Sequence, residues 1–184
     1  MSRDVSRNTA VQIVDDHGLP GAVPMSTIRR LVQEVTGREV TYRLVRGLAH
    51  QDVHGLWAGY DDGTAVVSYP PAPSGTQLVV INHEHGHMLI SPDGPAESHG
   101  IDPRFARFVQ EKVDGIMPGR RVVRSGETLE QEYTPDLEFL YGHTDFSEDE
   151  ERLAELVGVE LSVRVMRHAR ARGRDVRFGR VFGG

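Results

Sequence analysis

The chain has 184 residues, which suits one domain with a hydrophobic core of its own. It contains no cysteine, which excludes disulfides, thiolate metal sites and cysteine nucleophiles, so any bound metal must be held by imidazole and carboxylate groups. The net charge of -6 argues against a nucleic-acid-binding protein, and no apolar run is long enough to span a bilayer. The polar N-terminus lacks the pattern of a secretory signal, and we therefore expect a cytoplasmic protein.

The first 70 residues predict a helix followed by a small sheet. Residues 1–24 are polar and mixed in charge, and we expect a partly flexible segment there. Apolar residues at helical spacing follow Pro24 and stop at Gly37, which predicts an amphipathic helix. Segments rich in β-branched and aromatic residues predict three strands, at residues 38–45, 54–60 and 63–69. Asp61-Asp62-Gly63 is a hairpin turn signal, so we expect the small sheet to be mostly antiparallel.

The segment from residue 74 to residue 90 predicts a buried helix. Ser74 and Gln77 have the spacing of a capping box, and apolar residues fill most of the positions that follow. Ser91-Pro92-Asp93-Gly94 should end this helix, because proline and glycine interrupt the helical hydrogen bonds.

The second half of the chain predicts two further helices. Asp102-Pro103 should begin a helix that continues through Val113, within an otherwise irregular segment from 95 to 146. Ser147 and Glu150 form a second capping box, which opens a long helix through Met166. Seven arginines and one acid lie between residues 164 and 180. We interpret this stretch as a solvated helix end with a basic tail, residues 169–184, and the alternative is a docking surface for an acidic partner.

Residues 83–87 read His-Glu-His-Gly-His, an HExxH pattern within the predicted buried helix. His83 and His87 lie about 40° apart around a helix axis, so both imidazoles can point at one zinc ion. Glu84 follows His83 around the helix, where its carboxylate can accept a proton from a metal-bound water. His85 points to nearly the opposite side, so we expect it to pack against the protein and not to bind the metal.

Gly86 is unexpected in the middle of a helix. A glycine at such a position costs about 1 kcal/mol relative to alanine. It lies on the same side of the helix as the metal-binding histidines, so the close approach of another helix or strand would explain it.

A catalytic zinc site needs a third protein ligand. The second capped helix places Glu151 and Glu155 on one face, next to the small residues Ala154, Gly158 and Ser162, which allow close packing. We assign Glu151 as the third ligand and Glu155 as an acceptor that orients a ligand histidine. The reverse order remains open, and weaker candidates are Asp145, Asp149 and His143. Candidates for stabilising an oxyanion, none of which the sequence ties to the metal, are Tyr133, Tyr141 and His143.

These features together resemble the ImmA/IrrE family of metallo-endopeptidases. The resemblance is carried by VVINHEHGH at residues 79–87 and ERLAE at 151–155, and it extends roughly over residues 25–165. It implies an α+β, zincin-like single domain over residues 25–168, with a small sheet packed on the HExxH helix and a second long helix. It also implies Zn²⁺ bound by His83, His87 and Glu151, with Glu84 as general base. The 63 residues between His87 and Glu151 depart from the family pattern, since they are more than we expect, as does Leu153, where many members have a polar residue.

The resemblance further implies a zinc-dependent endopeptidase that cleaves a partner protein, such as a helix-turn-helix transcriptional repressor. We expect no direct contact with nucleic acid and none with a membrane, since the chain has no recognisable DNA-binding helix pair of its own and no apolar span. Two alternatives are a non-catalytic, metal-containing protein that regulates by binding, and a toxin-like component of a two-gene system. The intact Glu84 favours the enzyme, because a purely structural metal site needs no base.

Overall fold

The computed structural model describes residues 6–46, 55–93, 120–121, 132–133, 137–142 and 146–173. This part of the chain contains four helices, α1 (Arg7–Asp16), α2 (Met25–Thr36), α3 (Ser74–Ile90) and α5 (Glu148–Ala171). Its strands are β1 (Glu39–Leu44), β2 (Leu56–Tyr60), β3 (Thr64–Tyr69), β4 (Arg120–Arg121), β5 (Glu132–Tyr133) and β6 (Leu137–Gly142). The α+β class predicted from the sequence is confirmed.

The main sheet has four strands in the order β1-β3-β2-β6, and β4 and β5 form a separate antiparallel pair. β2 pairs antiparallel with both β3 and β6, whereas β1 runs parallel to β3. The expected hairpin joins β2 to β3, and Gly63 within it has a φ of 80°, which favours glycine. The sheet is therefore mostly antiparallel, as predicted, with one parallel edge strand.

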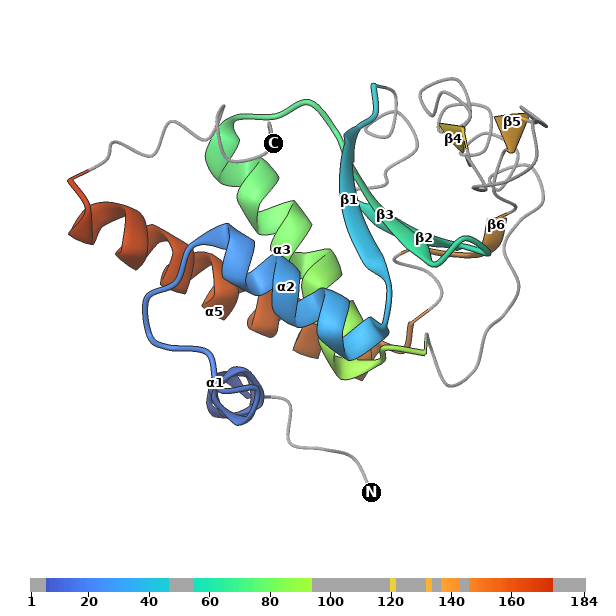
Figure 1. Cartoon of the computed structure of the whole chain (residues 1–184). Coiled ribbons are helices and arrows are strands. Elements are labelled where there is room, and N and C mark those ends of the chain that lie inside the picture. The colour runs from blue at the N-terminus through green and yellow to red at the C-terminus, as the bar shows by residue number, and fades with distance from the viewer. Residues whose placement is uncertain are drawn as a thin grey trace.

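Helices α2, α3 and α5 cluster on one side of the sheet, and α1 lies beyond them against α5 (Figure 1). The hydrophobic core fills the space between the sheet and these helices. Trp57 and Val67 extend into it from the sheet, and it includes Ile28, Ile81 and Leu161 from the helices. All five side chains are fully buried, so α2, α3 and α5 each contribute to one core beneath the sheet.

Helix starts follow the predicted positions, but their capping differs. Ser147 and Glu150 form the predicted capping box, in which the Glu150 amide donates to Ser147 Oγ and the Ser147 amide donates to Glu150 Oε2 at 3.0 Å. The capping box predicted for Ser74 and Gln77 is wrong. Ser74 is already the first helical residue of α3, and the cap is Pro73, which has no side chain able to accept a hydrogen bond.

Helix α1 lies in the segment for which the sequence predicted no element. It is joined to α5 by Arg164, whose guanidinium bonds the Asp15 carboxylate at 2.7 Å, the Glu160 carboxylate at 2.9 Å and the Leu19 carbonyl. Arg164 is only 3% exposed. It therefore does not belong to a solvated basic stretch, as the sequence had suggested, because the side chain is buried and paired with the buried Glu160 and the exposed Asp15.

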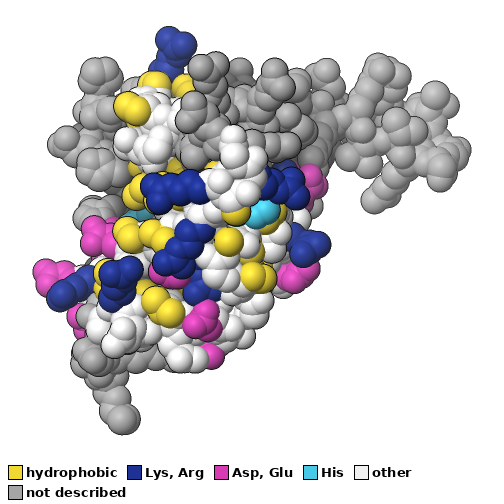
Figure 2. Space-filling view, turned by 90° about the vertical axis from the view of Figure 1, so that its left-hand side faces the viewer, with side chains coloured by type: hydrophobic (Ala, Val, Ile, Leu, Met, Phe, Trp, Pro, Cys, Tyr) yellow, Lys and Arg dark blue, Asp and Glu magenta, His cyan; other side chains and the backbone are white. Residues whose placement is uncertain are grey.

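Some predicted features lie outside the described residues, including the helix over residues 103–113 and the basic tail beyond residue 173. On the face in Figure 2, basic and acidic side chains mingle with hydrophobic ones and neither sign covers a large continuous area. No helix in the described ranges combines the length and apolar character needed to cross a membrane.

Candidate metal centre

Helices α3 and α5 pack with their backbones in contact at two glycines. A Cβ atom on Gly86 would lie 2.5 Å from the Ala154 carbonyl oxygen, and one on Gly158 would lie 2.7 Å from the His83 backbone nitrogen. Neither position has room for a side chain. The close approach predicted from Gly86 is therefore confirmed, and the approaching element is the helix that carries Glu151.

The close packing brings three of the predicted site residues together. His83 Nε2 and His87 Nε2 are 3.1 Å apart, and each lies 3.1 Å from an oxygen of the Glu151 carboxylate. In a tetrahedral zinc site with bonds of about 2.0 Å, neighbouring ligand atoms are about 3.3 Å apart. His83, His87 and Glu151 thus form a group that could hold a metal ion, and their two imidazoles and one carboxylate suit a divalent transition metal.

The surroundings shift the pKa values of all three clustered side chains. Burial lowers the pKa of His87, and the nearby charge of His83 lowers it further. Burial opposes ionisation of Glu151, but its hydrogen bonds to His83 and His87 hold the pKa of this carboxyl below its usual value. Burial also acts to lower the pKa of His83, yet the hydrogen bond that His83 donates to Glu151 and the charges of the surrounding carboxylates raise it overall. Glu151 is therefore ionised and His87 neutral, as ligands must be.

Phe146, just before α5, packs against the His87 ring. The two rings are stacked, with centroids 3.8 Å apart and planes 24° from parallel. The sequence analysis missed this contact. The available signal was position, because Phe146 directly precedes the N-cap Ser147, where an apolar residue often packs against neighbouring structure.

Glu84 is buried next to the three clustered side chains, with an exposed fraction of 3%. Burial raises the pKa of its carboxyl to about 8, the charge of His83 counteracts this, and the charge of Glu151 adds to it. The structure shows no hydrogen bond between this carboxylate and any other described residue. Within the described part of the chain, Glu84 thus presents a carboxylate without a protein partner beside the candidate metal-binding group.

Gly55, immediately before β2, lies directly against Glu84. A Cβ atom at this position would be 2.5 Å from Glu84 Oε1 and 2.8 Å from Val80 Cγ1. The absence of a side chain leaves the space that the carboxylate occupies. Sequence analysis did not single out Gly55, although a glycine at a strand end is a known sign of close approach by another group.

His85 is fully buried, as expected for a packed histidine, and it is not one of the three clustered side chains. Its Nδ1 lies 3.1 Å from Asn82 Oδ1 and its Nε2 lies 3.2 Å from the Tyr42 hydroxyl. Burial and the charge of Arg29 lower the pKa of His85 to about 3. The ring is therefore neutral and serves as a hydrogen-bonding bridge.

Glu155 does not act as predicted. Its side chain is exposed on α5, and no hydrogen bond joins it to His83 or His87 among the described residues. Its charge still helps to raise the pKa of His83. Because Glu151 alone of the two reaches both histidines, the reversed assignment has no support. Asp149 is also exposed, and the described side chains do not include Asp145, His143, Tyr133 or Tyr141.

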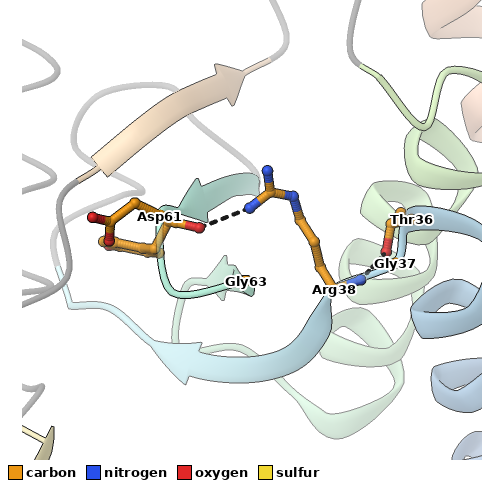
Figure 3. Close-up of a pocket in the computed structure, with 6 residues that line it drawn as sticks. Thr36, Gly37, Arg38, Asp61 and Gly63 are labelled. Atoms are coloured by element: carbon orange, nitrogen blue, oxygen red, sulfur yellow. Dashed lines mark hydrogen bonds between the residues drawn. The ribbon is translucent and has the colours of Figure 1, made fainter.

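A separate shallow pocket of about 210 Å³ lies where the end of α2 meets the β2–β3 turn (Figure 3). Its lining residues are Thr36, Gly37, Arg38, Tyr60, Asp61 and Gly63. The Arg38 guanidinium crosses it to donate a hydrogen bond to the Tyr60 carbonyl at 2.8 Å. None of these residues belongs to the candidate metal-binding group, so the pocket is not part of that site.

Comparison of the chain with protein-family models, with curated proteins and with solved structures finds no match.

Proposed function

We propose that this chain is a zinc-dependent endopeptidase that resembles the ImmA/IrrE proteins and cleaves a regulatory protein of the cytoplasm, such as a helix-turn-helix repressor. One observation carries the proposal. His83, His87 and Glu151 converge within hydrogen-bond distance of one another, and a buried Glu84, with no hydrogen-bond partner in the described ranges, lies beside them. The choice of a protein substrate rests on the resemblance of the two sequence motifs.

The three ligands fit zinc in number and chemistry. Catalytic zinc sites have three protein ligands, and a set of two histidines and one glutamate is one of their established forms. A zinc ion held by His83, His87 and Glu151 would supply a water molecule of lowered pKa, about 7, and a Lewis acid for a substrate carbonyl. Phe146 and Glu151 hold the ligand geometry from outside α3.

Glu84 supplies the acid-base chemistry in this proposal. Burial of a carboxyl group costs stability, which a purely structural site would have no reason to accept, and Glu84 is only 3% exposed. Its carboxylate takes a proton from the attacking water and then delivers it to the leaving amine of the cleaved peptide bond. Burial raises the pKa of Glu84 to about 8 without a metal, and the positive charge of a bound zinc ion would lower it toward neutral pH, where one carboxyl group can serve both transfers.

Comparison with the Glu84→Gln variant tests the enzymatic role while the substrate is still unidentified. The amide keeps the size of the side chain but removes its basicity, and both proteins should bind the same amount of zinc. Each is incubated with a cell extract, and newly formed protein N-termini are identified by amine labelling and mass spectrometry. We expect a small set of new N-termini with the wild-type protein only, and none after chelation of zinc.

Identical N-termini from both proteins would contradict the role of Glu84. If neither protein produces any, while both retain zinc and bind the same partner from the extract, the alternative of a non-catalytic regulatory protein is favoured. The extract experiment therefore distinguishes an endopeptidase from a non-catalytic regulatory protein, which the site residues alone do not distinguish.

A further inference from the structure

A row of four hydrogen-bonded side chains runs behind the candidate metal centre, on the side of α3 away from the ligands. It consists of Tyr42, His85, Asn82 and Ser162, which we call the register chain. Tyr42 comes from β1, His85 and Asn82 from α3, and Ser162 from α5. The sheet, the HExxH helix and the helix of Glu151 are thus joined by one set of side chains.

The hydrogen bonds of the register chain fit together with one consistent assignment of donors and acceptors. The Asn82 amide donates to Ser162 Oγ at 3.0 Å, so its oxygen is left to accept from His85 Nδ1 at 3.1 Å. His85 Nε2 then accepts from the Tyr42 hydroxyl at 3.2 Å. Ser162 Oγ donates in turn to the Gly158 carbonyl at 2.8 Å. Because Ser162 Oγ donates to the Gly158 carbonyl, it accepts from the Asn82 amide, and His85 completes the chain by bonding the remaining Asn82 oxygen.

The register chain ends where α3 and α5 touch. The Gly158 backbone, which accepts from Ser162, is the same backbone that lies against His83, the first metal ligand. An α-helix rises about 1.5 Å per residue, so a slip of α5 by a single residue would move Glu151 by half of its 3.1 Å distance from the histidines. Helix faces made of small residues permit close packing. They do not by themselves prevent such sliding, because glycine and alanine have no side chains that interlock.

We infer that the register chain is a positioning device for the metal centre, which holds α3 and α5 at the one relative height where Glu151 meets both histidines. This inference rests on the proposed metal site. It assigns His85, the central residue of the HEHGH sequence, a role in orienting Asn82. The inference also predicts that changes in the register chain alter metal affinity by more than their effect on the stability of the fold can explain.

The variant Ser162→Ala tests this inference, because it removes one oxygen and leaves a residue that favours helices. Zn²⁺ affinity is measured by competition with a chromogenic chelator, and the visible spectrum of the Co²⁺-loaded protein reports ligand geometry. We expect the Kd for Zn²⁺ to rise about tenfold, as for other residues that support metal ligands, with an altered Co²⁺ spectrum. Asn82→Ala combined with Ser162→Ala should raise the Kd no further, because either change breaks the same contact.

Two further variants separate positioning from general stability. Val32→Ala removes buried methyl groups from α2 and should lower Tm while the Zn²⁺ Kd stays within about twofold of wild type. Tyr42→Phe removes only the hydroxyl at the end of the register chain, and should raise the Kd for Zn²⁺ about threefold. Tyr42→Phe therefore provides a second test of the positioning role if Ser162→Ala folds poorly.

Unchanged Zn²⁺ affinity and Co²⁺ spectra in both Ser162→Ala and Tyr42→Phe, despite a lower Tm, would overturn the positioning role and leave the metal site intact. A wild-type protein that binds neither ion would overturn the metal site itself, and this inference with it. The two failures are therefore distinct.

Discussion

At the scale of single residues, Gly55 gives the sharpest test of how Glu84, the proposed general base, is placed. A side chain there would overlap Glu84 Oε1 and Val80 Cγ1, at 2.5 and 2.8 Å. Gly55→Ala should displace the Glu84 carboxylate but leave all three metal ligands in place. We expect zinc stoichiometry to be retained, while the rate of cleavage of a substrate identified from the extract falls by about a hundredfold, the scale of a lost general base.

Gly75→Ala is the matched control for Gly55→Ala. It makes the same substitution in the first turn of α3, where an added Cβ meets nothing within 4 Å. This control should cleave at the wild-type rate. A Gly55→Ala enzyme that also keeps the wild-type rate would show that Glu84 does not depend on the space beside β2.

The sequence predicted the residues of the site better than the residues that support them. His83, Glu84 and His87 follow from spacing within one helix, and Glu151 from a capped helix with small neighbours. Residue spacing could not predict the contacts of Phe146 and Gly55, because each packs against a residue from a distant part of the chain. Spacing along one helix specifies direction around its axis, whereas packing between elements depends on the whole fold.

At the scale of elements, the contact between α3 and α5 depends on Gly86. An added Cβ would lie 2.5 Å from the Ala154 carbonyl oxygen and 3.1 Å from its Cα, and backbone atoms cannot move aside as a flexible side chain can. We expect Gly86→Ala to force the helices apart. The strain, about 1 to 3 kcal/mol, should exceed the gain of about 1 kcal/mol that alanine gives in a helix.

Urea unfolding of the metal-free protein measures the effect of Gly86→Ala, and chelator competition measures zinc binding. We expect a lower free energy of unfolding together with weaker zinc binding, because Glu151 moves with α5. A more stable protein with wild-type zinc affinity would mean that the helices are not in backbone contact at this point.

The elements themselves were predictable where the signal is local. Pro24 and Gly37 bound α2, the turn at 61–63 sets the β2–β3 hairpin, and Ser147 begins α5. Helix α1 was missed because its apolar face is short, with Ala10 and Val14 as its buried residues. It owes its place to partners far along the chain, above all Arg164, which no local pattern reveals.

At the scale of the whole molecule, Arg164 joins the beginning of the described chain to its last helix. Its guanidinium bonds Glu160 on α5 itself and Asp15 on α1, and its carbonyl accepts from the Val23 amide at 3.3 Å. Arg164→Ala would leave the buried Glu160 carboxylate without its partner. We expect the free energy of unfolding to fall by about 3 kcal/mol, as for other buried ion pairs that lose one member.

Thermal and urea unfolding measure this loss, with Arg167→Ala as the control, since Arg167 is exposed one turn further along α5. The control should change stability by less than about 0.5 kcal/mol. If Arg164→Ala and Arg167→Ala are equally stable, the bonds of Arg164 to Glu160, Asp15 and Leu19 do not contribute to the stability of the fold.

Metal analysis of the purified protein tests the central claim most directly. The wild-type chain, prepared without chelators, should contain about one zinc per chain, and Glu151→Ala should lose most of it because the third ligand is gone. Less than about one zinc per four chains in the wild-type protein, with no gain on adding Zn²⁺, would contradict the assignment of His83, His87 and Glu151 as a metal centre.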